Sequence, residues 1–330
     1  MILIIPVVNQ KGLTKQIVQS LEDTVEDKGH FHIVIVDNDS DPVYTLIDFT
    51  DNVKEAKENK LLKKGEIHIT VIRNDFNVGH YYPLKQVYDL YHNLYPQEVI
   101  ATVHNDVIFY EKGWDVRVNE EFLHDPYLGL LGFVGSNQAD YVGGRGVGTV
   151  GNLAGIQGSP MEQHGKRITN LQPSVLLDSL FMAFRTTVIP SLGINEHITP
   201  YHFYDKIWSC KTIEAGYRVA TLGISIDHLG GKTGLGEEKC WDDSKQWLEK
   251  EGLYDPNEDP LMTIYKVAEK RWLSEYRDQK GFIPCCVDQN YKIWTWLMQD
   301  NGISLFEYHK CNKSRPSHVL PLPVSEVLPQ

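Results

Sequence analysis

The chain has 330 residues, a hydrophobic fraction of 42% and a charged fraction of 23%, values typical of a folded globular protein, so general disorder is excluded. Its formal net charge of −12 argues against a broad surface for nucleic acid or anionic membrane, since such surfaces concentrate Lys and Arg. We therefore expect no nucleic-acid partner, and a phosphate-bearing substrate would need a metal ion or a helix N-terminus.

The cysteines and apolar runs indicate a soluble protein of a reducing compartment. The cysteines are five in number, and none shows C-x-x-C spacing: Cys210, Cys240, Cys285, Cys286 and Cys311. The first residues lack the positive region and cleavage site of a signal peptide, and no apolar run approaches the about 18 residues that span a bilayer. We expect a cytoplasmic protein without a transmembrane segment.

The apolar pattern predicts strands and helices in alternation. A β-branched run predicts a strand over 2–8, and apolar residues at helical spacing predict a helix over 14–21. The further predicted elements are strands over 32–36, 67–72 and 99–109 and a helix over 84–94. Runs apolar on both faces and joined by helices are typical of an α/β fold with a mostly parallel sheet flanked by helices. In that fold, ligands bind beyond the carboxyl ends of the strands.

Acidic residues follow the second predicted strand. Asp37-Asn38-Asp39-Ser40-Asp41 comes directly after an apolar run that ends at Val36. These side chains can accept hydrogen bonds from a nucleobase or from ribose hydroxyls. The alternative is an Asx turn, because Asp, Asn and Ser are also the commonest turn formers.

Two further strand ends carry candidate metal ligands. His104-Asn105-Asp106 interrupts a fully apolar run, and a buried carboxylate there needs a partner such as a metal ion. A later apolar run ends at Asp227-His228, followed by glycines, and brings an imidazole that can join Asp106. A turn or cap for Asp106 and a structural role for His228 are the alternatives.

The order of these segments resembles the inverting glycosyltransferase family 2, which has the GT-A fold. The resemblance covers about residues 1–235. Its blocks are Ile-Ile-Pro-Val-Val-Asn (4–9), Val-Asp-Asn-Asp-Ser-Asp (36–41), Arg-Asn-Asp-Phe-Asn-Val-Gly-His (73–80), His-Asn-Asp-Val (104–107), Leu-Leu-Asp-Ser-Leu-Phe-Met-Ala-Phe-Arg (176–185), Phe-Tyr-Asp-Lys-Ile-Trp (203–208), Glu-Ala-Gly-Tyr-Arg-Val (214–219) and His-Leu-Gly-Gly-Lys-Thr (228–233).

The resemblance implies a donor site and a metal site. The residues implied to bind the nucleotide-sugar are Pro6, Val8, Asp37, Asn38, Asn77, Gly79, Asn105 and Asp106. Asp106 matches the last position of the family's D-x-D metal motif, whose first acid is replaced by His104. His228 matches a histidine that completes metal or diphosphate binding, so the implied ligands are Asp106, His228 and His104 for Mn²⁺ or Mg²⁺.

The resemblance also implies the reacting groups. Asp205 matches the first aspartate of the family's E-D-x-D block, the usual catalytic base, although Tyr204 and Ile207 replace the two flanking acids. Asp178 matches a position that faces the sugar or the acceptor. These residues imply a metal-assisted transfer of a hexosyl-type sugar, with inversion, from a nucleotide-diphosphate sugar to a glycan or other hydroxyl acceptor.

Two other functions remain open. The acids missing at His104 and Ile207 allow a non-catalytic protein that binds nucleotide or glycan on the same scaffold. A nucleotidyltransferase shares the sheet and the metal but needs a Gly-rich basic loop after the first strand, of which Asn9-Gln10-Lys11-Gly12 is a poor version. The G-x-G-x-x-G of 146–151 is not preceded by a strand, and Gly231-Lys232-Thr233 lacks the earlier glycine of a P-loop.

The remaining segments are predicted to support the catalytic domain. The glycine-rich stretch 129–165 is predicted to be a long flexible loop near the acceptor side. Residues 236–315 are predicted to form a helical extension, since apolar residues recur there at helical spacing among charges. The Pro-rich tail 316–330 is predicted to be extended or poorly ordered.

Overall fold

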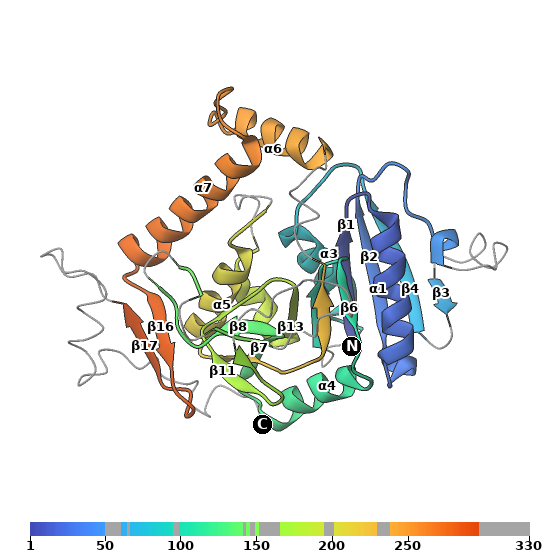
Figure 1. Cartoon of the computed structure of the whole chain (residues 1–330), viewed down its shortest axis with the longest axis horizontal. Helices are drawn as coiled ribbons and strands as arrows, with labels where there is room; N and C mark the ends of the chain where they lie inside the picture. Colours follow the sequence, from blue (N-terminus) through green and yellow to red (C-terminus); the bar gives the residue numbers. More distant parts are fainter. Residues whose placement is uncertain are drawn as a thin grey trace, which may run out of the picture.

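The structure is a computed structural model, which describes residues 1–49, 61–64, 67–94, 99–140, 143–145, 149–151, 166–194, 201–229 and 238–296. A central sheet of nine strands dominates it (Figure 1). In spatial order these are β11 (Gln172–Ser174), β14 (Arg218–Thr221), β7 (Leu128–Gly132), β13 (Phe181–Arg185), β5 (Val99–Val103), β1 (Ile2–Val7), β2 (His32–Asn38), β4 (Ile67–Asn74) and β3 (Leu61–Lys64).

The sheet is mostly parallel. Strands β4, β2, β1, β5, β7 and β14 run in one direction, and β3, β13 and β11 run in the other. The register places Val7 beside Asp37 and Asp37 beside Arg73, so the carboxyl ends of β1, β2 and β4 lie at one edge. The α/β class and the mostly parallel sheet predicted from the sequence are confirmed.

Helices cover both faces of the sheet. One face carries α1 (Lys11–Thr24) and α4 (Trp114–His124), and the other carries α3 (Tyr81–Tyr91) and α5 (Tyr204–Glu214). Because successive strand residues point to opposite faces, Leu3 and Ile5 of β1 pack in the first core while Ile2 and Ile4 pack in the second. A fully buried aliphatic side chain contributes about 1.5–3 kcal/mol, which explains why the predicted strands are apolar on both faces.

Two predictions about local structure are wrong. The single strand predicted over 99–109 is broken at the polar residues 104–106 into β5 and β6 (Val107–Phe109), and β6 pairs instead with β15 (Ile226–His228). The predicted loop 129–165 contains buried β7 and β8 (Val134–Ser136). Its glycines serve close packing: a Cβ at Gly135 would lie 2.4 Å from Oγ1 of Thr221.

Only parts of the remainder of 129–165 lie within the described residues. These parts are the segment 143–145 and β9 (Thr149–Gly151). Strand β9 is the last part of the G-x-G-x-x-G sequence that the sequence analysis set aside. Residues 141–142, 146–148 and 152–165 lie outside the described residues, as do 231–233 of the rejected P-loop and the tail from 297 onward.

The C-terminal extension is helical at first and then adds a hairpin that the sequence analysis missed. It comprises α6 (Glu238–Lys250), α7 (Pro260–Trp272), a π-helical turn (Leu273–Gln279) and the paired strands β16 (Ile283–Val287) and β17 (Ile293–Trp296). Trp272 and Tyr276 are buried in the same core cluster as Phe203 and Trp208 of the α5 region. The extension is therefore packed onto the sheet domain. Among the described residues, no helix is both long and apolar enough to cross a membrane.

Candidate functional site

A narrow pocket lies at the carboxyl ends of the central parallel strands. Its volume is about 30 Å³, and its walls come from the ends of β1 and β2, the loop before α3 and the residues after β5. It brings together most of the residues that the sequence resemblance implied for donor binding: Pro6, Val8, Asn38, Asn77, Gly79 and Asn105. The topology of the sheet explains the convergence, since parallel strands end at one edge.

A chain of amide contacts shapes this pocket. The Asn38 side chain donates to the carbonyl of Gly79 at 3.0 Å and accepts from Asn74 Nδ2 at 2.9 Å. The backbone N–H of Gly79 in turn donates to Asn77 Oδ1 at 3.0 Å. Gly79 has a φ of 71°, a left-handed conformation that favours glycine over residues with a Cβ. The loop before α3 is thus fixed against the end of β2.

Asp37 lies at the end of β2, but it is fully buried and does not line the pocket. Its Oδ1 accepts from the backbone N–H of Ser40 at 2.9 Å. Its Oδ2 accepts from the backbone N–H of Tyr44 at 3.1 Å and from Arg73 at 2.7 Å. Both oxygens therefore hold the turn that follows β2, which favours the Asx-turn interpretation.

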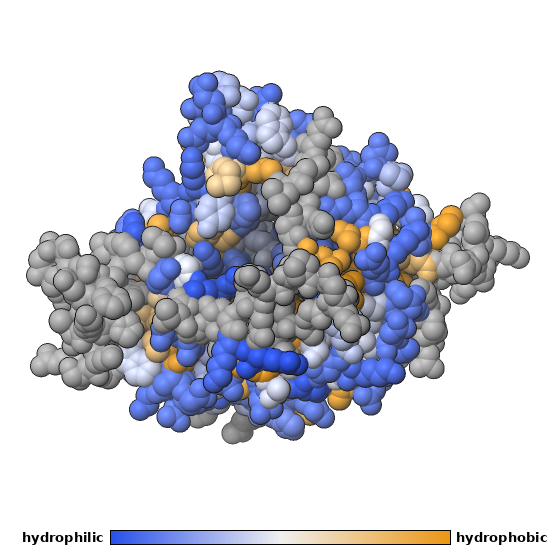
Figure 2. Space-filling model, viewed as in Figure 1, coloured by the Kyte–Doolittle hydropathy of each residue, from blue (hydrophilic) through white to orange (hydrophobic). Residues whose placement is uncertain are grey.

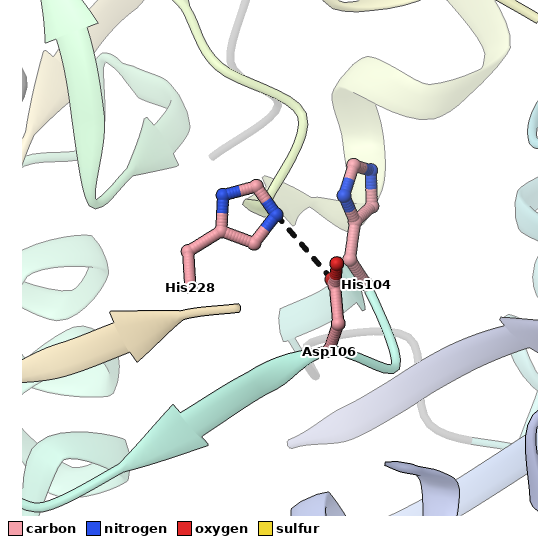
Figure 3. Close-up of side chains that lie close together, drawn as sticks. All are labelled: His104, Asp106 and His228. Atoms are coloured by element: carbon pink, nitrogen blue, oxygen red, sulfur yellow. Dashed lines mark ion pairs between the residues drawn. The ribbon is translucent and has the colours of Figure 1, made fainter. Parts of the chain in front are cut away.

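Three candidate metal ligands meet beside the pocket. His104 and Asp106 flank the break between β5 and β6, and His228 ends β15, which pairs with β6 (Figure 3). Their ligand atoms all lie within 4.8 Å of one another, a spacing that small side-chain rotations reduce to that of ligands on one cation. Nε2 of His228 is 3.3 Å from Oδ1 of Asp106. The structure thus brings the three residues together, and their role as metal ligands stays a prediction.

The residues present fit a divalent transition-metal ion. Asp106 is 3% exposed, and its Oδ1 accepts no hydrogen bond of regular geometry from the described residues, an arrangement that is costly without a further partner. Burial lowers the pKa of His104, which keeps this imidazole neutral and available as a ligand. Imidazole nitrogen and carboxylate oxygen are both ligands that divalent transition metals accept in proteins.

The contact between Asp106 and His228 favours the charged form of each group. Burial acts to raise the pKa of Asp106, but the neighbouring imidazoles of His228 and His104 outweigh it and lower that pKa. Burial likewise acts to lower the pKa of His228, and the contact with Asp106 outweighs it and raises that pKa. A divalent cation would replace the proton of His228 as the positive partner of the carboxylate.

A larger cavity of about 240 Å³ adjoins the narrow pocket. The two share four lining residues, His80, His104, Tyr201 and Cys240. The larger cavity is walled by the start of α5 and by Leu261 and Tyr265 of α7, and a hollow is visible below the α6–α7 hairpin (Figure 2). Asp205, the candidate base, lines this cavity from the first turn of α5.

The electrostatics around Asp205 suit a proton acceptor. Burial raises the pKa of Asp205, and the charge of the neighbouring Lys206 opposes this shift without cancelling it. The segment before it is strained, since His202 and Phe203 have φ values of 66° and 61° in succession. Such conformations cost about 1–3 kcal/mol each for residues with a side chain and are typical of functional sites.

Asp178 lies in the turn between β12 (Leu176–Leu177) and β13. It is ion-paired with Arg145 and accepts from the N–H of Leu180 at 3.0 Å. Burial acts to raise the pKa of Asp178, but the Arg145 charge outweighs it and lowers that pKa. Its contribution to sugar or acceptor binding stays a prediction.

Sequence reasoning missed several residues of the site, notably His80, Tyr201 and Tyr204. The ring of His80 stacks on Tyr204 with centroids 5.4 Å apart, and burial lowers the pKa of His80 to about 3. His80 ends the quoted block 73–80, so its neighbourhood was visible in the sequence, whereas nothing local marked Tyr201. Lys11, the basic residue of the nucleotidyltransferase alternative, is bound by Asp48 at 2.9 Å, which weakens that alternative.

No family model matches the chain, and no curated protein matches it. Among solved structures, the mannosyltransferase PcManGT from Pyrobaculum calidifontis in complex with GDP-Man and Mn²⁺ is 14% identical, with 83% of this chain and 68% of that chain covered and a TM-score of 0.46. S. aureus TarS 1–349 in complex with UDP-GlcNAc is 15% identical, with 84% and 74% covered and a TM-score of 0.46. GalNAc-T7 with UDP, GalNAc and Mn²⁺ is 11% identical, with 83% and 56% covered and a TM-score of 0.48. At these identities and TM-scores, we base no conclusion about this chain on the similarity.

Proposed function

We propose that this chain is a glycosyltransferase of the GT-A fold that moves a hexosyl-type sugar from a nucleotide-diphosphate sugar to an acceptor hydroxyl, with inversion. The proposal rests on one observation: candidate site residues from separate sequence blocks lie close together in the folded chain. Most of those implied for the donor line one pocket, and those implied for the metal form one cluster at its side. His104 belongs to both, so the donor pocket and the metal cluster adjoin.

The larger cavity is proposed to hold the acceptor. It opens from the donor pocket at His80 and His104, and its walls carry the aromatic rings of Tyr201, Phe203 and Tyr265. Aromatic faces suit the apolar faces of sugar rings, which favours a glycan acceptor. Asp205 lines the same cavity and would take the proton from the acceptor hydroxyl as it attacks the anomeric carbon, a contribution of about 10²–10⁴-fold to the rate.

The chain's own residues determine how the cation is held. His104, Asp106 and His228 would hold it beside the donor pocket, and the bound cation would supply positive charge to stabilise a departing diphosphate. Asn77 and Gly79 would orient the nucleotide from the loop before α3, and Asn38 keeps that loop in place. Inversion would require the acceptor hydroxyl to attack from the larger cavity, on the face of the sugar opposite the departing diphosphate.

The test is release of free nucleotide from a panel of UDP-, GDP-, dTDP- and CMP-sugars, measured with Mn²⁺ and with chelator. Transferases commonly hydrolyse their donor slowly without an acceptor, so the proposal expects Mn²⁺-dependent release from one class. Tight binding of a nucleotide without release or transfer would instead favour the non-catalytic binding protein. Release that persists unchanged in chelator would contradict the role of the cation.

A further inference from the structure

The phenol of Tyr204 contacts a metal-ligand candidate across the junction of the two cavities. Its Oη lies 2.9 Å from Nε2 of His104. Tyr204 is the first residue of α5 and is 5% exposed, and His104 directly follows β5. One contact therefore joins the helix of the candidate base to the metal cluster.

This contact determines which nitrogen of His104 is left for a cation. A neutral imidazole has one N–H and one lone pair, and Nε2 is already engaged by Tyr204. The nitrogen that remains for the cluster with Asp106 and His228 is Nδ1, and the ring stands beside Asp106 with one nitrogen on the side of His228 (Figure 3). When Nδ1 binds a cation, Nε2 carries the hydrogen and donates it to Tyr204 Oη.

The packing around Tyr204 leaves its hydroxyl little freedom. Its ring stacks on His80 with an interplanar angle of 11°. It also meets Tyr81 and Trp208 edge-on, at centroid distances of 5.4 and 5.0 Å. Rings packed on several sides keep one rotamer, so the position of Oη is set by the core and not by solvent.

We propose that Tyr204 is a positioning residue of the metal site, whose hydroxyl fixes the ring orientation and the tautomer of His104 so that Nδ1 faces the cation. The inference rests on the proposed function only in requiring that the cluster bind a cation. It requires no particular sugar or acceptor. Partners that orient metal-ligating histidines typically contribute 10- to 100-fold to metal affinity.

The experiment compares the whole chain with its Tyr204→Phe and Tyr81→Phe variants by calorimetric titration with Mn²⁺ in the absence of nucleotide. Tyr81 is the matched control, since it belongs to the same ring stack and its buried hydroxyl has no hydrogen-bond partner among the described residues. We expect Tyr204→Phe to bind Mn²⁺ about 10- to 100-fold more weakly. Tyr81→Phe is expected to bind as the wild type does.

A second readout separates positioning from a general loss of structure. The visible absorption of bound Co²⁺ reports the ligand geometry, and it should change in Tyr204→Phe at saturating metal and not in Tyr81→Phe. Melting curves in chelator are expected to agree within a few degrees, because the variant loses only the hydrogen bonds of one hydroxyl, to His104 and Ser179, of about 1 kcal/mol each. Equal Mn²⁺ affinity and equal Co²⁺ spectra for wild type and Tyr204→Phe would overturn this inference and leave the proposed metal site standing. Failure of the wild type to bind either metal would overturn the metal site and the inference together.

Discussion

The side-chain amide of Asn77 donates a hydrogen bond of 2.8 Å to Oδ2 of Asp243, which lies 166 positions later on α6. The same amide also donates to the hydroxyl of Tyr201. A residue implied to contact the donor is thus held by the C-terminal extension in the ligand-free protein. The adjoining pocket of about 30 Å³ is far below the about 300 Å³ of a typical small-molecule site. We therefore expect an entering nucleotide to displace these contacts.

Removal of Asp243 is therefore expected to strengthen nucleotide binding. In Asp243→Ala the amide of Asn77 has one competing partner fewer, and a hydrogen bond to a charged group contributes about 1.5–3 kcal/mol. We expect the dissociation constant of the preferred nucleotide to fall by about 10-fold or more, measured calorimetrically with Mn²⁺ present. Asp242→Ala, which alters the exposed neighbouring residue, is the control. If Asp243→Ala bound the nucleotide more weakly while Asp242→Ala did not, α6 would instead stabilise the nucleotide-bound protein.

Replacement of His104 by an acid is expected to change the metal preference. Carboxylate oxygens suit Mg²⁺ and imidazole nitrogen suits transition metals, so His104→Asp should lower the ratio of Mn²⁺ to Mg²⁺ affinity by about 10-fold or more. The two affinities are measured by titration in separate experiments. An unchanged ratio would mean that His104 does not ligate the cation.

Loss of the Asp205 carboxylate is expected to remove turnover while donor binding survives. Asp205→Asn should lower kcat by about 10²–10⁴-fold, with the nucleotide dissociation constant within about twofold of wild type. The base must be ionised, so turnover falls as pH drops through the pKa of Asp205, which burial raises above the ordinary value of an aspartate. Lys206→Met removes the charge that opposes this shift, so the acid limb of the rate profile should move to higher pH. If the acid limb of the pH–rate profile stayed in place in Lys206→Met, a group other than Asp205 would accept the proton.

The fold should also lose stability in mild acid because of His32. Burial, followed by the charge of His68, lowers the pKa of His32 from 6.5 to about 4. The folded protein therefore binds fewer protons than the unfolded chain, and its stability is highest above pH 6.5 and falls between pH 6.5 and about 4. Between pH 7.5 and 5 this group costs about 2 kcal/mol of unfolding free energy. Denaturant unfolding should show an acid loss that is about 2 kcal/mol smaller in His32→Gln than in wild type and in His30→Gln, an exposed control.

The sequence predicted best those features that depend on local pattern. The parallel strands β1, β2 and β4 follow from apolar runs on both faces, and the convergence of Asn38, Asn77 and Gly79 follows from the shared carboxyl edge of such a sheet. Asp106 and His228 could be grouped because each lies near the end of a predicted strand, and the resemblance to the family's metal motif added His104.

The rest depends on contacts between distant segments. Glycine content suggested a loop at 129–135, but the same glycines allow close approach in buried strands, as Gly135 does beside Thr221. Asp37 was a candidate for donor binding because its partner Arg73, on a different strand, is invisible to local pattern. Tyr201 and Tyr204 enter the site because a strained turn before α5 delivers them there, and a single sequence carries little signal for positive φ at aromatic residues.

The central claim is that a nucleotide diphosphate binds this chain through a cation held by His104, Asp106 and His228. Thermal unfolding of wild type and of Asp106→Asn with UDP, dTDP, GDP and CMP, each with Mn²⁺ and with chelator, tests it most directly. The account predicts that one nucleotide raises the melting temperature of wild type with Mn²⁺, and that the shift disappears in chelator and in Asp106→Asn. A shift that survives both changes, or no shift with any of the nucleotides, would contradict it.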